Sequence, residues 1–192
     1  MKQKYITIPF GKKDARIRVV LCRKPMEKGL SGMVRGKDFA NDLAILLDKE
    51  PSEEAEYLYA ALVGSGDLFF AIRMSPAVFH GIRRGDPMAR TCLFHELGHY
   101  VRKHLLTPGF QTEDYDRERY FLASEGKVIR QELEADAFAA EYLGCDVVAG
   151  GLCRIRSLHE KSLGEGTYDP EGVAVAMREL NSRIEKLRHG SE

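Results

Sequence analysis

Two histidines and a glutamate near the middle of the chain have the residue types and the spacing of a metal site. The segment His95-Glu96-Leu97-Gly98-His99 matches the pattern HExxH. Residues four apart lie on one face of a helix, so the imidazoles of His95 and His99 can bind the same metal ion. Glu96 is offset around the helix and can instead reach a water molecule on that metal. The motif therefore predicts one Zn²⁺ cofactor, with Glu96 as the catalytic acid and base.

Gly98 lies in the middle of this predicted helix and needs an explanation. A glycine at such a position costs about 1 kcal/mol relative to alanine. Close approach of another chain segment, or of a substrate, would supply the reason. A surface helix with two partly exposed histidines is the alternative interpretation, and the glycine argues against it.

A zinc ion requires a third protein ligand, and a histidine just beyond the motif does not supply it. The extended pattern HExxHxxGxxH needs a histidine at position 105, which is Leu105 in this chain. His104 is one residue off and faces another direction. We expect it to be a surface or second-layer histidine.

Carboxylates on a later helix are the alternative source of the third ligand. Glu132 and Asp136 are four residues apart and share one helix face. Glu132 can bind the metal while Asp136 accepts a hydrogen bond from the outer nitrogen of a ligand histidine. Glu134 points elsewhere and is the weaker candidate. Without the preceding HExxH motif, these carboxylates would be read as an ordinary solvated face.

The elements that must position these residues follow from the hydrophobic periodicity. An N-terminal hairpin is predicted over residues 6–21, a strand over 68–74, and loops over 23–36 and 109–120. Helices are predicted over 37–48, 51–63, 86–106, 127–143, 147–163 and 170–189, several of them opened by Asp-Pro or closed by glycine. The expected fold class is α+β: a helix-rich zinc metallopeptidase fold with a small β-sheet and an HExxH helix.

Composition narrows the class of protein. The 192 residues carry 29 basic and 29 acidic side chains, so the formal net charge is zero. This balance gives no electrostatic reason to expect direct nucleic-acid binding. The length suits a single domain over 1–192, with a motif-bearing core at about 67–144. The four cysteines form no CxxC pair, which favours free thiols in a reducing compartment.

The two motifs together resemble a known group of enzymes. HExxH followed by ExxxD on a second helix is similar to the glutamate-zincins (gluzincins), and residues 90–100 and 132–139 resemble the ImmA/IrrE family. The second choice is a soluble domain of the HtpX/CAAX-processing peptidase type. The resemblance covers about residues 67–144. It implies a compact metallopeptidase fold with His95, His99 and Glu132 as zinc ligands, Glu96 as the catalytic acid/base, and a protein or peptide substrate.

Peptide hydrolysis also needs a donor for the developing oxyanion, and the sequence leaves this donor open. The available groups are Tyr100, Tyr142, Arg154, His159 and Tyr168. Each of them is individually better explained as a structural or solvated residue.

The last predicted helix carries an apolar seam with spacings of four and three residues, formed by Val173, Met177, Leu180, Ile184 and Leu187. Packing on the same domain is the favoured interpretation. A homodimer or a partner helix held through 173–187 is the alternative.

Neither a signal peptide nor a spanning segment is expected from the sequence, so we expect a cytoplasmic protein without membrane attachment. The leading functional prediction is a zinc-dependent endopeptidase. A catalytically weak regulatory or protein-binding module on the same scaffold, and a regulator acting with a DNA-binding partner, are the alternatives.

Overall fold

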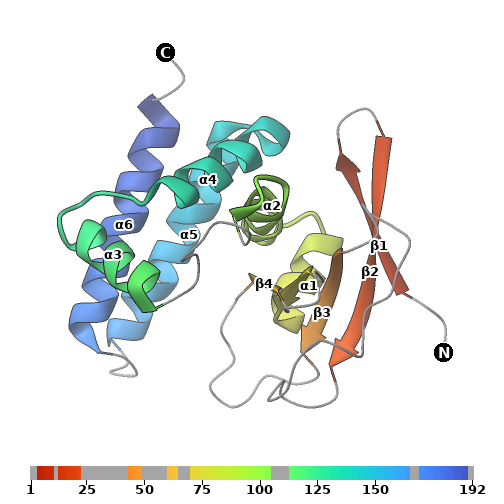
Figure 1. Ribbon diagram of the computed structural model, residues 1–192, viewed down its shortest axis with the longest axis horizontal. Coiled ribbons are helices and arrows are strands. Elements are labelled where there is room, and N and C mark those ends of the chain that lie inside the picture. The colour runs from red at the N-terminus through yellow and green to blue at the C-terminus, as the bar shows by residue number, and fades with distance from the viewer. Residues whose placement is uncertain are drawn as a thin grey trace.

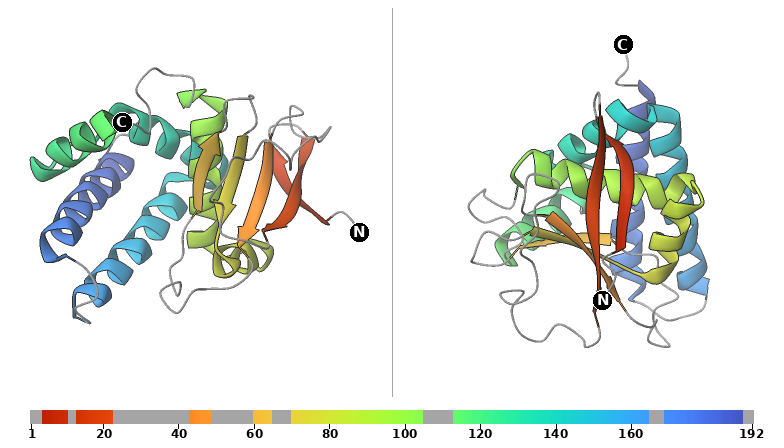
Figure 2. Two further views of the ribbon diagram at one scale, coloured as in Figure 1. Left: turned by 60° about the horizontal axis from the view of Figure 1, so that its bottom comes forward. Right: turned by 90° about the vertical axis from the view of Figure 1, so that its right-hand side faces the viewer.

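The computed structural model describes residues 4–10, 13–22, 43–48, 60–64, 70–104, 113–164 and 169–189, with side-chain environments given mainly from Ile72 onward. The predicted loop at 23–36 lies outside the described residues. Strands and helix α1 occupy one side of the molecule and helices α3 to α6 the other, with α2 between them (Figure 1; Figure 2, left).

Five strands form one sheet in the order β1-β2-β3-β5-β4. Strand β1 pairs antiparallel with β2, β3 lies parallel to both β2 and β5, and β4 is antiparallel to β5. The alternating residues of the predicted hairpin lie in β1 and β2. The bounds are β1 (Lys4–Phe10), β2 (Lys13–Cys22), β3 (Leu43–Asp48), β4 (Ala60–Gly64) and β5 (Phe70–Met74).

The helices predicted over 37–48 and 51–63 are wrong where the structure describes them. Leu43–Asp48 is strand β3, and Ala60–Gly64 is strand β4. A short apolar run has no periodicity that separates a buried strand from a buried helix. β3 lies between two parallel neighbours, a position in which continuous apolar runs are typical of strands.

In the described part of the chain, six helices follow the strands and carry the candidate site. The helix predicted over 170–189 appears with those bounds, and those over 86–106, 127–143 and 147–163 appear with shifted ends, whereas α1 and α3 were not predicted. The bounds are α1 (Pro76–Arg83), α2 (Pro87–Val101), α3 (Glu113–Ser124), α4 (Arg130–Leu143), α5 (Cys145–Gly164) and α6 (Pro170–His189).

The predicted exposed loop over 109–120 is also wrong in its described part, because helix α3 begins at Glu113. The segment is mostly polar, but its few buried residues have the spacing of a helix. Tyr115 and Ala123, eight residues apart, are buried on one face, and Arg119 lies halfway between them. Most of the other side chains of α3 are exposed, which gives the segment the composition of a loop.

The α+β class predicted from the sequence is wrong for the part of the chain whose side chains are described. That part is 84% helical and is a helical fold. Apart from Ile72 and Met74, the buried residues of the core cluster come from helices α1, α2, α4, α5 and α6. The physical reason is that the apolar residues after position 75 recur at intervals of three and four, so they bury against other helices rather than across a sheet.

Helix α2 begins as the sequence predicts. The Asp86 carboxylate accepts a hydrogen bond from the Ala89 amide at 2.9 Å, and Pro87 occupies the first turn. The helix ends at Val101, five residues before the predicted end. Lys103, two residues after the end of the helix, has φ of 60°, in the left-handed region.

Two glycines allow other helices to approach α2 closely. A Cβ on Gly98 would lie 2.8 Å from Ala135 Cα and 2.9 Å from Ala135 O, both in α4. A Cβ on Gly151 of α5 would lie 2.7 Å from Thr91 Cβ. The glycine in the HExxH motif is therefore explained by close approach of another chain segment. This crossing brings the predicted histidines of α2 and carboxylates of α4 together.

The apolar seam of α6 packs within the chain. Val173, Leu180, Ile184 and Leu187 are buried, the last three in the core cluster, and α6 lies against α5. Met177 is half-buried. Among the described residues, no helix combines the length and the apolar character needed to cross a membrane.

The close crossing at Gly98 gives a stability prediction. We expect Gly98→Ala to lower the free energy of unfolding of the metal-free protein by about 1–3 kcal/mol, because the added methyl group would overlap the α4 backbone. Urea denaturation followed by circular dichroism measures the change. Gly150→Ala is the control: this glycine is exposed on α5 with nothing within 4 Å of an added Cβ. Alanine there should stabilise the protein by about 0.5–1 kcal/mol. A Gly98→Ala protein as stable as the wild type would contradict the crossing.

Candidate metal centre

Three side chains from two helices converge at the crossing of α2 and α4. His95 Nε2 lies 3.1 Å from His99 Nε2 and 3.2 Å from Glu132 Oε2. His99 Nε2 lies 3.6 Å from Glu132 Oε1. The three residues are 9%, 4% and 4% exposed. The structure thus brings together the two histidines of the motif and the glutamate predicted from the later helix.

This arrangement fits the coordination of a metal ion. Each of the three residues offers one ligand atom, and these atoms all lie within 4.8 Å of one another. Ligands about 2.0–2.2 Å from a tetrahedral ion are spaced about 3.4 Å apart. The measured separations of 3.1, 3.2 and 3.6 Å bracket that value. His95, His99 and Glu132 could therefore hold a metal ion.

Asp136 is positioned to orient the first histidine. Its Oδ1 lies 2.8 Å from His95 Nδ1, so the ring can donate to the carboxylate while Nε2 faces the cluster. Arg183 of α6 donates to the same carboxylate through Nε and Nη2, both at 2.7 Å. Arg183 also reaches Glu132, with Nη1 3.2 Å from Oε2. One guanidinium thus contacts both buried carboxylates.

Glu132 receives further contacts from helix α3. The Tyr115 hydroxyl donates to Glu132 Oε1 at 3.3 Å, and Arg119 Nη1 lies 3.5 Å from the same oxygen. Arg119 also donates to both oxygens of Glu179 of α6, at 2.9–3.2 Å. Both oxygens of Glu132 therefore have hydrogen-bonding or charged neighbours.

Tyr115, Arg119 and Arg183 contact the site but were not predicted from the sequence. The first two lie in the segment expected to be a loop, although their spacing of four residues is helical. Arg183 lies on the last predicted helix, directly before the seam residue Ile184. Glu179 and Arg183 are also four residues apart, which was the available signal for a shared helix face.

The second histidine is oriented by a different group. His99 Nδ1 lies 2.8 Å from His104 Nδ1, and His104 Nε2 lies 2.9 Å from Glu134 Oε2. His104 is only 3% exposed, so of the two alternatives expected for it, the second-layer position is the observed one. Glu134 faces His104 and Arg130 rather than the cluster. The geometry thus favours Glu132 over Glu134 as the third ligand.

The charge states of the cluster follow from these contacts. Burial and Arg183 oppose protonation of His95, but hydrogen bonds to Asp136 and Glu132 raise its pKa to about 9. Burial and the charge of His95 lower the pKa of His99 to about 3. A ligating imidazole must be neutral, so in the metal-free protein His99 is ready to bind and His95 must first release a proton.

The two carboxylates stay ionised although they are buried. Burial by itself raises the pKa of Glu132, but the hydrogen bond from His95 and the charges of Arg183 and Arg119 hold that pKa well below its usual range. Burial likewise opposes ionisation of Asp136, and Arg183 lowers its pKa to about 2. Glu132 is therefore available as an anionic ligand at neutral pH.

Glu96 lies half-buried on α2, next to His95 in sequence. Its charge reaches Cys92, one turn earlier: burial, followed by the charge of Glu96, raises the pKa of the Cys92 thiol to about 12. Cys92 therefore remains a thiol and is a poor nucleophile or metal ligand. Glu96 follows His95 directly on α2, and a carboxylate is a group that suits acid–base chemistry.

The groups proposed as oxyanion donors lie in several different places. Arg154 donates to Asp86 at 2.7 Å, at the start of α2 and about 13 Å along the helix from His95. The Tyr142 ring packs against Phe94 and Phe138. These placements give no support to a catalytic role for Arg154 or Tyr142.

The other three oxyanion candidates are Tyr100, His159 and Tyr168. Tyr100 packs against the core, and half-buried His159 lies toward the far end of α5. Tyr168 lies outside the described residues.

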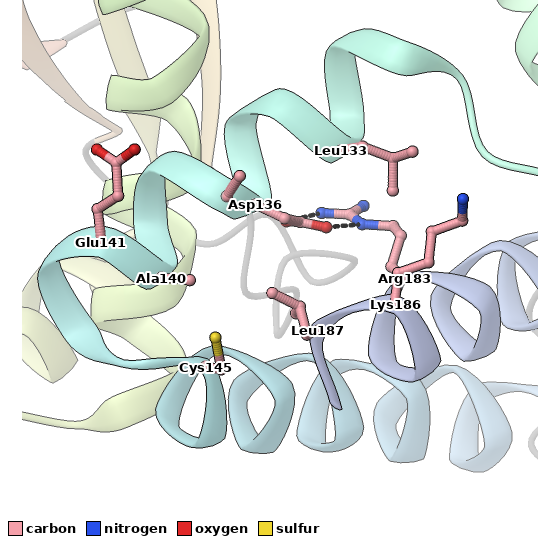
Figure 3. A pocket seen from close by; sticks show the side chains of 9 residues that line it. Leu133, Asp136, Ala140, Glu141, Cys145, Arg183, Lys186 and Leu187 are labelled. Carbon is pink, nitrogen blue, oxygen red and sulfur yellow. Dashed lines mark hydrogen bonds and ion pairs between the residues drawn. The ribbon is translucent and has the colours of Figure 1, made fainter. Parts of the chain in front are cut away.

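A cavity of about 530 Å³ lies beside the Asp136–Arg183 ion pair, between α4, the start of α5 and α6 (Figure 3). Leu133 and Leu187 supply apolar lining, and the Lys186 side chain lies at its edge (Figure 3). The lining does not include His95, His99 or Glu132. Asp136 and Arg183, which line the cavity, are also in contact with the cluster residues His95 and Glu132.

Comparisons with known proteins do not identify a relative: no protein-family model, curated protein or solved structure matches this chain.

The placement of Glu132 gives a metal-binding prediction. We expect the wild type to bind one Zn²⁺ per chain and Glu132→Gln to bind it more than about 100-fold more weakly, since outer-layer partners alone account for about 10- to 100-fold. Competition with a chromophoric chelator measures both affinities. Glu141→Gln, an exposed site on the same helix, should bind as the wild type does. Equal affinities for the Glu132→Gln and Glu141→Gln proteins would remove Glu132 from the ligand set.

Proposed function

We propose that this protein is a zinc-dependent endopeptidase of the glutamate-zincin type. The observation that carries the proposal is the triangle of His95 Nε2, His99 Nε2 and the Glu132 carboxylate, with edges of 3.1–3.6 Å. Two neutral imidazoles and one carboxylate are the donor set of many catalytic zinc sites. A tetrahedral site with nitrogen and oxygen donors favours zinc among the common divalent ions.

Bound zinc would supply Lewis acidity, which lowers the pKa of a water ligand toward about 7 and polarises a peptide carbonyl. The chain's own residues must do the rest. Asp136 holds the His95 ring through Nδ1, which directs Nε2 toward the cluster. Arg183 and Tyr115 hold the Glu132 carboxylate from two sides and limit its rotation.

Glu96 is the proposed base and acid. Its carboxylate would accept a proton from the attacking water and return that proton to the amine that leaves when the peptide C–N bond breaks. Its place beside His95 on α2 puts it near the cluster without making it a ligand. The HExxH spacing supports this division of roles.

The resemblance to the ImmA/IrrE family supports a protein or peptide as the substrate. His95, Glu96, His99, Glu132 and Asp136 are the positions that carry it. We also propose a cytoplasmic location, because the three cysteines whose side chains are described, Cys92, Cys145 and Cys153, are free thiols.

A protein-binding module on the same scaffold is the second candidate. The observation in its favour is that Arg183 pairs with both Glu132 and Asp136, and Arg119 lies close to Glu132, so the buried carboxylates have cationic partners within the chain. Such a network could serve only to hold α3, α4 and α6 together. Hydrolysis of a peptide by the wild type separates the two candidates.

Replacement of the base tests the mechanism. We expect Glu96→Gln to bind Zn²⁺ as tightly as the wild type but to lose peptidase activity at least about 100-fold, because general-base catalysis is worth about 10²–10⁴. Cleavage of unfolded casein, followed by mass spectrometry, measures the activity. Glu125→Gln, at an exposed position between α3 and α4, is the control and should retain full activity. Undiminished cleavage by Glu96→Gln would contradict the assigned role.

A further inference from the structure

The two histidines of the cluster are held by different outer groups. His95 donates directly to a carboxylate, that of Asp136. His99 instead faces a second imidazole, that of His104, with 2.8 Å between the two Nδ1 atoms. His104 in turn lies 2.9 Å from Glu134 Oε2 through its other nitrogen. His104 and Glu134 therefore form a chain that runs from the cluster to the surface of α4.

The geometry permits one arrangement of protons in this chain when a metal is bound. His99 Nε2 is the atom that faces His95 and Glu132, so it must carry a lone pair to act as a ligand. The proton of neutral His99 then resides on Nδ1 and is donated to His104 Nδ1. His104 must accept on that nitrogen, so its own proton is on Nε2 and is donated to Glu134.

The backbone keeps His104 in this position. Helix α2 ends at Val101, three residues before His104, and Lys103 adopts φ of 60°, a left-handed conformation uncommon for residues other than glycine. The His104 ring that follows packs edge-on to the His99 ring, with centroids 5.0 Å apart. Strained backbone of this kind persists only where surrounding contacts fix it.

The outer end of the chain is also fixed. Glu134 accepts from Arg130 Nε at 2.6 Å through Oε1, which leaves Oε2 for His104. The Glu134 side chain is about one-third exposed, whereas the His104 side chain is 4% exposed. Because Glu134 is partly exposed, it can be replaced without creating a cavity in the core.

We propose that His104 and Glu134 are positioning residues that hold His99 in its Nδ1–H tautomer, with Nε2 directed at the metal. This inference rests on the metal site of the proposed function. It assigns no contact with substrate to either residue. If His104 holds the ligand atom of His99 in place, its loss weakens metal binding as well as any reaction at the metal.

Metal affinity is the first test, with the full-length chain and Zn²⁺ alone as the probe. We expect His104→Phe, which keeps a ring but removes the acceptor, to weaken Zn²⁺ binding about 10- to 100-fold. His104→Asn places a carbonyl oxygen near the former Nδ1 position and should recover much of that loss. Glu134→Ala should weaken binding by a smaller factor, and the exposed Glu141→Ala on the same helix should leave it unchanged.

A spectroscopic measurement separates positioning from a merely structural role. The ¹⁵N shifts of the His99 ring in the Zn²⁺ form should report the Nδ1–H tautomer in the wild type and in His104→Asn, and a tautomer mixture in His104→Phe. A purely structural role would lower the thermal stability of the variants but leave the tautomer and the Zn²⁺ affinity unchanged, and that result would overturn the proposal.

The outcomes distinguish this inference from the function on which it rests. A wild type without stoichiometric Zn²⁺ binding would overturn the metal site and this inference with it. Zn²⁺ binding that depends on His104, in a protein without peptidase activity, would support the positioning role while contradicting the proposed function. If His104→Phe fails to fold, His104→Asn and Glu134→Ala decide: Zn²⁺ affinity and His99 ¹⁵N shifts equal to the wild type in Glu134→Ala would overturn the proposal.

Discussion

The buried negative charge of Glu132 and Asp136 is the constraint on which the helical arrangement depends. The two residues are only 4% and 2% exposed, and an uncompensated buried carboxylate costs several kcal/mol. His95 compensates from α2, and Arg183 from α6 contacts both carboxylates. Helices from three separate parts of the sequence must therefore pack together before either charge can be buried.

The close approach of α2 and α4 makes this compensation possible. Gly98 has no side chain to separate the two backbones, so the imidazoles of α2 reach the carboxylates of α4 at hydrogen-bonding distance. The same approach packs Phe138 against the core beside Gly98. The geometry of the candidate metal site and the core packing thus both depend on one residue of the HExxH motif.

The buried carboxylates of the cluster are balanced by His95 and by the Arg183 guanidinium. His95 is held as a cation between two carboxylates, with its pKa raised to about 9. A divalent ion bound at this cluster would have to displace that proton, with Arg183 close by. Metal binding there would therefore be coupled to proton release, a general property of histidine metal sites.

The sequence by itself determined the residues whose relation is local. His95 and His99, and Glu132 and Asp136, share faces because a spacing of four residues is a property of one continuous helix. Tertiary structure decided the rest. The sequence of strand β3 has the spacing of a helix, and only its pairing with two parallel neighbours makes it a strand. Arg183 contacts His95, which is 88 residues earlier in the sequence. His104, three residues past the end of α2, joins the site through its contacts with His99 and Glu134. Such contacts depend on how helices cross and how chains turn in space, and local periodicity carries no information about either.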